Sequence, residues 1–324
     1  MGRKQKLRQE KKHIKNKAAT TAEVTAAAAA AAAVATTFLN EDAIAETAEE
    51  KMLAVRVRQI ERALALDNQL PRSDTHVQAM ADTDNISYGE QWELFEQGVT
   101  EDECVHSMQG MGDIYMNTTE EKRIHLALPW YLEGAIRGSV QSTISLMGTF
   151  YIRSNRALYC YWGKITKKYY GGVALVDRMK FKELKDLVER ECVICSKTDT
   201  STFTLQQCKG CSVYCYCDEG CQTIHWEERK HRNECKQVHI LNKYHKPYAK
   251  EIRDAVIRGD KEIPSLEKLR YKLGLTRPRK EYIEFHEPTS THNGKIINPD
   301  DYLVAREDGT VWVGSTPRSP IRTS

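Results

Sequence analysis

Apolar residues recur at helical spacing from residue 40 to residue 70, where the first regular element is predicted. Asn40 is a suitable N-cap, and the two acidic residues after it favour the positive end of a helix dipole. The apolar positions that follow are Ile44, Ala48, Leu53, Val57, Ile60 and Leu64. Their spacing predicts an amphipathic helix over residues 40–70 that buries one face. The next stretch, Pro71 to Ile86, is rich in Asp, Ser, Thr and Asn and is predicted to be a linker.

Residues 88–162 contain an internal repeat. Met111–Tyr115 (Met-Gly-Asp-Ile-Tyr) is echoed 36 residues later by Met147–Tyr151 (Met-Gly-Thr-Phe-Tyr). The small and aromatic residues between the two copies are Ala127, Trp130, Gly134, Ala135 and Gly138. A weaker echo of their Trp-to-Gly part precedes the first copy at Trp92, Phe95 and Gly98. A period in the thirties with small residues at fixed places is typical of stacked helix pairs, because Gly and Ala let two backbones approach while Trp, Tyr and Met fill the seam.

These residues resemble the Sel-one-like subclass of tetratricopeptide-type repeats, in which a helix bearing Leu-Gly-x2-Tyr pairs with one bearing Ala-x2-Trp and Ala-Ala-x2-Gly. The resemblance covers at most two units, and Met116–Lys122 stands where the family has a glycine-rich loop. Two units are fewer than a free-standing solenoid needs, so we expect neighbouring helices to cap them. An ordinary helical bundle is the alternative, and either arrangement gives a helical domain without a catalytic residue.

The C-terminal region, residues 238–324, is predicted to be helical at first and to end in a hairpin and a flexible tail. Helical patterning extends over residues 236–281 and is broken near two prolines. The segments that predict a type I′ hairpin are Tyr302–Glu307, the turn Asp308-Gly309, and Thr310–Gly314.

Residues 1–39 are basic and then alanine-rich, and we expect a disordered tail. The first seventeen residues hold eight Lys or Arg and one acidic residue, Glu10, and an alanine run follows at Ala26–Ala33. A nuclear address, an RNA-contacting arm and organelle import are the alternatives for this segment. The sequence contains no run of eighteen apolar residues, so no transmembrane helix is expected. We therefore predict an intracellular protein of the nucleus or the cytoplasm.

The strongest chemical signal is a series of eight cysteine and histidine residues with regular spacing. Two, twelve, two, five, three, nine and three residues separate Cys192, Cys195, Cys208, Cys211, Cys217, Cys221, His231 and Cys235. A two-residue knuckle lets both sulfurs reach one zinc ion at about 2.3 Å, and longer loops supply the other ligands of each tetrahedral site. Eight ligands predict two structural zinc ions in closed sites without a position for substrate. Disulfides and an iron–sulfur cluster are the alternatives.

The order of these ligands resembles the MYND zinc finger over residues 190–237. That family runs Cys-x2-Cys, Cys-x2-Cys, an aromatic stretch, Cys-x3-Cys-Gln, a Trp and His-x3-Cys. The matching residues outside the ligand set are Tyr214, Tyr216, Gln222 and Trp226. The resemblance implies interleaved sites, one formed by Cys192, Cys195, Cys217 and Cys221 and the other by Cys208, Cys211, His231 and Cys235. It also implies binding of short, often proline-containing peptides of partner proteins.

Two features depart from the family. Four residues separate Trp226 from His231 where the family has two, so the helix carrying the last ligands is expected to be longer or bulged, or His225 is the ligand. We favour His231 because His-x3-Cys places both ligands one turn apart on one helix face. His225 is then expected on the surface, and Cys215 is expected to be a spare thiol.

The charge of the finger argues for a protein partner. Between Cys192 and Cys235 the sequence has five basic and six acidic residues, and seven thiolates on two divalent ions make the finger more negative. Nucleic-acid binding depends mainly on clustered Lys and Arg that neutralise phosphates, so it is not expected through the finger, although the basic N-terminus could supply it. No membrane partner is expected.

Enzyme signatures are absent from the sequence, which lacks a Gly-rich phosphate loop, a Gly-x-Ser-x-Gly elbow and a His-Glu-x2-His motif. A SET-type lysine methyltransferase relative and a RING-like ubiquitin ligase are the alternatives, but neither the motifs of the first nor the ligand order of the second is present. We predict a mainly α protein with a disordered N-terminal tail, a helical domain over residues 88–162 and a two-zinc finger over residues 190–237. Its predicted function is that of a non-enzymatic adaptor.

Overall fold

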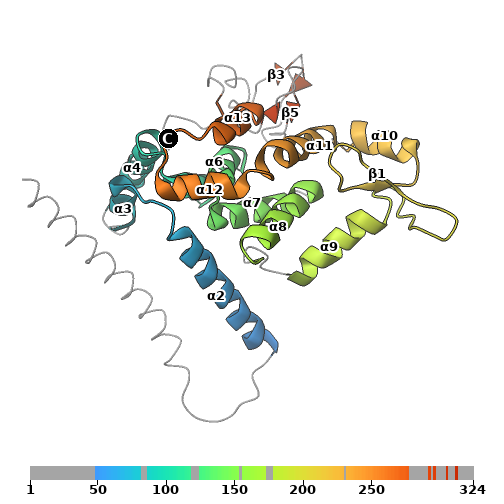
Figure 1. Cartoon of the computed structure of the whole chain (residues 1–324), viewed down its shortest axis with the longest axis horizontal. Coiled ribbons are helices and arrows are strands. Elements are labelled where there is room, and N and C mark those ends of the chain that lie inside the picture. The colour runs from blue at the N-terminus through green and yellow to red at the C-terminus, as the bar shows by residue number, and fades with distance from the viewer. Residues whose placement is uncertain are drawn as a thin grey trace, which may run out of the picture. The chain divides into compact units, whose positions relative to one another are not determined.

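The computed structural model describes residues 48–81, 86–117, 124–152, 155–172, 178–229 and 231–276, together with four two-residue strands after residue 290 (Figure 1). Contacts divide the chain into two units, Met1–Leu53 and Ala54–Ser324. The described residues contain twelve α-helices, so the prediction of a mainly helical protein is confirmed. The basic and alanine-rich segment and the expected N-cap Asn40 lie outside the described residues.

The first helix, α2 (Ala48–Asp67), lies within the predicted range 40–70 but does not bury the predicted face. Val57, Ile60 and Leu64 are all exposed, so that part of the prediction is wrong. The buried residues lie at its C-terminal end instead and include Asp67. The spacing of apolar residues could not predict this buried contact, because Asp67, which makes it, is an acidic residue.

Asp67 caps another helix, α7 (Val140–Ile152), far along the chain. Its carboxylate accepts hydrogen bonds from the backbone N–H groups of Val140 at 2.8 Å and Gln141 at 2.9 Å, and from the Ser139 hydroxyl at 3.0 Å. These first-turn amides have no partner within their own helix, and a negative charge at this end also favours the helix dipole. A buried carboxylate is therefore stabilised at the end of α2.

The predicted linker contains a helix, α3 (Asp74–Ala81), which packs against α4 (Tyr88–Thr100). Ala79 is fully buried, and the His76 ring lies 5.7 Å from the Phe95 ring. The Ser73 hydroxyl accepts a hydrogen bond from the backbone N–H of His76 at 3.1 Å. The polar residues that predicted a linker therefore begin a helix, since Ser and Asp are as common at helix N-termini as in loops.

Five helices follow one another in the chain, and each packs against the next. They are α4, α5 (Val105–Asn117), α6 (Ile124–Ile136), α7 and α8 (Arg156–Tyr169). The two copies of the five-residue echo lie on α5 and α7, where Met111 and Met147 are both buried. Gly98 on α4 and Gly134 on α6 are also 36 residues apart, and each lies against a serine of the following helix, Ser107 or Ser142. Glycine permits this close approach at both places.

Two glycines of the echo give a matched pair for a stability test. A Cβ at Gly112 would clash with the Tyr131 ring, whereas a Cβ at Gly148 would meet nothing within 4 Å. We expect Gly112→Ala to lower the free energy of unfolding by about 1–3 kcal/mol through overpacking. Gly148→Ala should raise it by about 1 kcal/mol through helix propensity. Urea denaturation of both variants measures this, and equal effects would contradict the difference in packing.

The remaining elements lie after α8. Their bounds are α9 (Arg178–Arg190), β1 (Gln206–Gln207), β2 (Cys215–Tyr216), α10 (Glu219–Glu227), α11 (His231–Ile240), the π-helix η1 (Leu241–His245), α12 (Ala249–Arg258), α13 (Pro264–Lys272), β3 (Thr291–His292), β4 (Lys295–Ile296), β5 (Val304–Ala305) and β6 (Val311–Trp312). The helical patterning expected after residue 236 corresponds to four of these helices, and Pro264 begins α13 rather than interrupting a helix.

Each pair of strands is antiparallel, in the order β1–β2, β3–β4 and β5–β6. In the last pair Val304 faces Trp312 and Ala305 faces Val311. This pairing confirms an antiparallel hairpin, but not the predicted two-residue turn. A type I′ turn at Asp308-Gly309 would pair Ala305 with Trp312, one residue away from the observed register. The turn itself lies outside the described residues. The β3–β4 pair is not among the predicted elements, although the dipeptide Asn293-Gly294 stands between its strands in the sequence and favours a hairpin turn.

Arg253 of α12 joins the C-terminal helices to the first ones. Its guanidinium donates hydrogen bonds to the backbone carbonyls of Gly138 and, at 2.7 Å, of Leu66, and it lies 3.9 Å from the Asp67 carboxylate. It also lies over the Tyr170 ring, 5.4 Å from the centroid. One buried side chain thereby connects the end of α2, the α6–α7 turn and α12.

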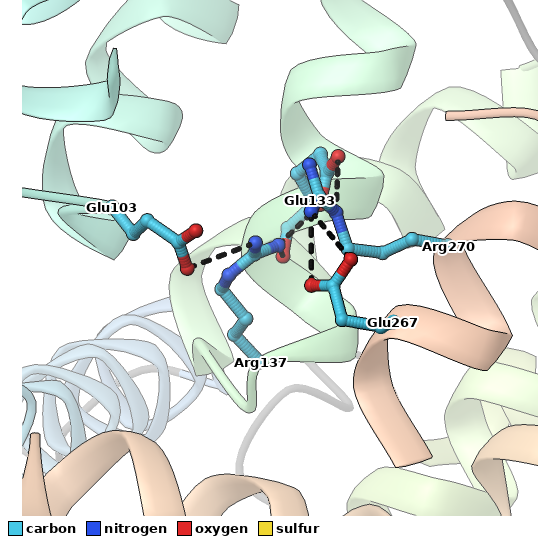
Figure 2. Close-up of polar contacts among 5 residues, drawn as sticks. All are labelled: Glu103, Glu133, Arg137, Glu267 and Arg270. Carbon is cyan, nitrogen blue, oxygen red and sulfur yellow. Dashed lines mark hydrogen bonds and ion pairs between the residues drawn. The ribbon is translucent and has the colours of Figure 1, made fainter. Parts of the chain in front are cut away.

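A second buried ionic group connects α6 with α13 (Figure 2). Glu133 on α6 pairs with Arg137 one turn later and accepts from Arg270 of α13 at 3.1 Å through both carboxylate oxygens. Arg270 also pairs with Glu267 at 3.0 Å, and Arg137 lies 3.6 Å from Glu103. Burial alone would lower the pKa of Arg270, but Glu133 and Glu267 outweigh it and raise that pKa, so Arg270 stays charged.

Candidate metal centre

Both Cys-x2-Cys knuckles have the same backbone. The residue after each second cysteine is a serine in the left-handed region, Ser196 with φ 58° and Ser212 with φ 54°. The N–H of Ser196 donates to the Cys192 carbonyl at 2.8 Å, and that of Ser212 donates to the Cys208 carbonyl at 2.9 Å. Left-handed backbone is costly for a residue with a Cβ and tends to persist at functional sites. A serine follows each knuckle in the sequence, and this shared position is a signal that ligand spacing alone does not include.

The first cluster consists of four thiols, those of Cys192, Cys195, Cys217 and Cys221. Cys217 Sγ lies 3.4 Å from Cys195 Sγ and 3.4 Å from Cys221 Sγ. Cys221 lies in the first turn of α10, where the N-cap Asp218 accepts a hydrogen bond from its backbone N–H at 2.8 Å. The helix N-terminus therefore positions one ligand of this cluster.

The second cluster consists of Cys208, Cys211, His231 and Cys235, and all four are buried. His231 Nε2 lies 3.4 Å from Cys208 Sγ and 3.8 Å from Cys211 Sγ. Cys208 Sγ lies 3.7 Å from Cys235 Sγ. The knuckle residue Gly210 is required here, because a Cβ would clash with the Cys235 sulfur.

These separations fit a shared metal ion and exclude disulfides in this structure. In a tetrahedral zinc site with bonds of about 2.3 Å, neighbouring sulfurs lie about 3.8 Å apart. The ligand atoms of each cluster all lie within 4.8 Å of one another, and every cysteine is a free thiol. The eight residues singled out from the sequence therefore come together as two groups of four. The grouping is the interleaved one that the family resemblance implied.

The second cluster is an electronegative environment. Burial alone would lower the pKa of His231, but Cys208 and Cys211, which accept from its ring as thiolates, raise it to about 11. The sulfurs therefore favour a positive charge beside them. A divalent cation bound by thiolates and neutral imidazole would replace that positive charge.

His225 is buried, so the expectation that it lies on the surface is wrong. Its ring stacks on that of His231 with centroids 4.6 Å apart and planes 5° apart, and its Nδ1 lies 2.9 Å from the Tyr216 hydroxyl. Burial, followed by the charge of His231, lowers the pKa of His225 to about 4. His225 therefore packs against His231 of the second cluster but is not one of its four members.

Trp226 and His231 lie on two consecutive helices, and the first of these ends at Glu227. We expected a longer or bulged helix, whereas α10 ends at Glu227 and α11 begins at His231. Because α11 begins at His231, this residue and Cys235 lie one turn apart on the same helix. Cys215 belongs to neither cluster, and its thiol donates to the Glu189 carbonyl at 3.3 Å.

No protein-family model, curated protein or solved structure that was compared with this chain matches it. Fold and site together define a mainly helical protein with two four-residue Cys/His clusters that could each hold a metal ion. Among the described residues, no helix has the length and apolarity needed to cross a membrane.

Proposed function

We propose that this protein is a zinc-dependent protein–protein adaptor. Its MYND-type finger would recognise peptide segments of partner proteins, and its helical region would act as a scaffold. The observation that carries the proposal is the pair of interleaved clusters, each with four protein ligands. Four ligands complete the tetrahedron that structural zinc prefers, whereas catalytic zinc keeps one position open.

Zinc is the metal that this donor set favours. The donors are seven thiols and one imidazole, which are soft or intermediate ligands. Zinc binds such ligands well, whereas magnesium and calcium prefer oxygen ligands. The resemblance to the MYND family rests on these eight residues and on the four matching residues between them. Peptide recognition is what that resemblance implies for this chain.

Charge supports a protein rather than a nucleic acid as the partner of the finger. Five basic residues against six acidic ones, together with seven thiolates, leave the segment Cys192–Cys235 negative once two divalent ions are bound. Phosphate backbones would be repelled by such a surface. The proposed compartment is the nucleus or the cytosol, where thiols remain reduced and available for zinc.

Proximity labelling with the full chain tests this function. We expect a reproducible set of labelled proteins that disappears with Cys208→Ser combined with Cys211→Ser, because that change removes half of the second cluster. Cys215→Ser is the matched control, since Cys215 lies in the same finger outside both clusters. Far-UV circular dichroism establishes whether the helices of each variant remain folded.

The proposal fails if the disrupted finger labels the same set as the intact protein. It also fails if the purified chain transfers methyl groups from S-adenosylmethionine to histones or recovered partners and a substitution outside the finger abolishes this transfer. Such a result would assign the protein to the methyltransferases.

A further inference from the structure

Glu234 is a buried carboxylate that lies between two proposed zinc ligands, His231 and Cys235, on α11. Its oxygen Oε1 accepts hydrogen bonds from the backbone N–H groups of Ala157 at 2.8 Å and Leu158 at 3.2 Å. Both amides belong to the first turn of α8. A residue of the finger thus caps a helix of the helical region.

This cap replaces the one that α8 does not make locally. The N-cap residue Asn155 forms no side-chain capping hydrogen bond, so the first-turn amides depend on another acceptor. The helix that they begin is central to the core. Most of its residues are buried, including Leu158, Trp162 and Ile165.

The same carboxylate faces the second cluster. Its other oxygen, Oε2, accepts from the Tyr214 hydroxyl at 3.0 Å and lies 3.7 Å from His231 Nδ1. That separation is an ion-pair distance rather than a hydrogen bond. Nε2 of His231 faces the sulfurs, so Glu234 lies on the opposite edge of the ring. At this distance Glu234 acts on the ring through its charge. A negative charge beside Nδ1 favours the hydrogen on that nitrogen and leaves Nε2 free to bind a metal.

We propose that Glu234 is a positioning residue that couples the second zinc site to α8. Zinc bound by His231 and Cys235 fixes the first turn of α11. Because Glu234 lies in that turn, its carboxylate then stays at the N-terminus of α8. Occupancy of this cluster therefore controls the order of α8, whereas occupancy of the first cluster does not. The inference rests on the proposed zinc binding and adds a specific route from the metal to the scaffold.

Two substitutions at Glu234 separate its two contacts. Glu234→Gln keeps an oxygen for the α8 amides but removes the charge beside His231. We expect zinc affinity of the second cluster to fall about tenfold, the low end of the effect of losing a hydrogen-bonded partner, with little change in amide exchange at Ala157 and Leu158. Chelator competition measures the affinity. Glu234→Ala should lower the affinity and also speed exchange at both amides about tenfold or more. Glu227→Gln, an exposed position on α10, is the control.

Hydrogen exchange of single-cluster variants tests the coupling itself. Cys211→Ser should speed exchange at the start of α8, and Cys195→Ser should leave it unchanged. Equal effects of the two variants would overturn the coupling. Unchanged zinc affinity in Glu234→Gln would also overturn it, because Glu234 would then be only a helix cap.

Elemental analysis of the same samples separates failure of the inference from failure of the proposed function. Zinc-free wild-type protein would overturn zinc binding and the coupling with it. Two zinc ions per chain with a cluster-independent response of α8 would overturn the coupling alone.

Discussion

Purified protein should contain two zinc ions per chain, and their removal by a chelator should unfold the segment from Cys192 to Cys235. Structural zinc contributes on the order of 10 kcal/mol of folding free energy per site. The small core beside the first cluster consists of Cys192, Leu205, Cys215 and Cys217, so two of its four buried residues are proposed ligands. Without the ion this core has too little apolar area to remain folded. Elemental analysis and circular dichroism with and without chelator measure both effects.

Substitution of the two stacked histidines tests which of them binds the metal. His231→Ala should release one zinc and leave the other, because its Nε2 faces Cys208 and Cys211. His225→Ala should retain both ions, although it loses the contact with Tyr216 and should be less stable. The ligand assignment is wrong if these outcomes are exchanged. Protein that is free of zinc, with thiols that react only after reduction, would instead indicate disulfides.

Glu133→Ala should be among the most destabilising single substitutions in the helical region. It leaves Arg137, which is 1% exposed, without its nearest carboxylate, and it removes one of two acidic partners of Arg270. Removal of one member of a buried ion pair typically costs about 3–5 kcal/mol because a charge remains buried without compensation. Urea denaturation with a linear extrapolation measures the change in the free energy of unfolding.

Glu267→Ala is the matched control for this substitution. Glu267 also pairs with Arg270, but its side chain is 54% exposed, so solvent screens the pair. Its loss should cost no more than about 1 kcal/mol. Similar costs for the two variants would mean that Glu133 is not the centre of the network drawn in Figure 2.

The candidate site could be located from the sequence because metal ligands follow local geometric rules. A two-residue knuckle and a His-x3-Cys turn are properties of a few consecutive residues, and Cys208, Cys211, His231 and Cys235 could be recognised without knowledge of the fold. Gly210 shows the limit of that reasoning. Its role follows from the position of Cys235, which reaches the knuckle only in the folded chain.

The choice between alternative positions for polar side chains required the tertiary structure. The residues beside His225 in the sequence do not distinguish it from a surface histidine. In the folded chain, however, it is buried against Tyr216 and His231. Glu234 carries no sequence signal for its contacts, since the amides that it caps are more than seventy residues earlier in the chain.

The sequence by itself determined that the protein is mainly helical, that helices lie within residues 40–70, 88–162 and 236–281, and which eight residues form the two clusters. These properties depend on periodicity, capping and ligand spacing, which act over a few residues. The tertiary structure alone decided that α2 leaves Val57, Ile60 and Leu64 exposed and is anchored through Asp67. It also decided that the stretch after Pro71 forms a helix, and that Glu234 belongs to both the finger and α8. Such features depend on which distant groups meet, and a buried carboxylate is stable only where those partners supply its hydrogen bonds.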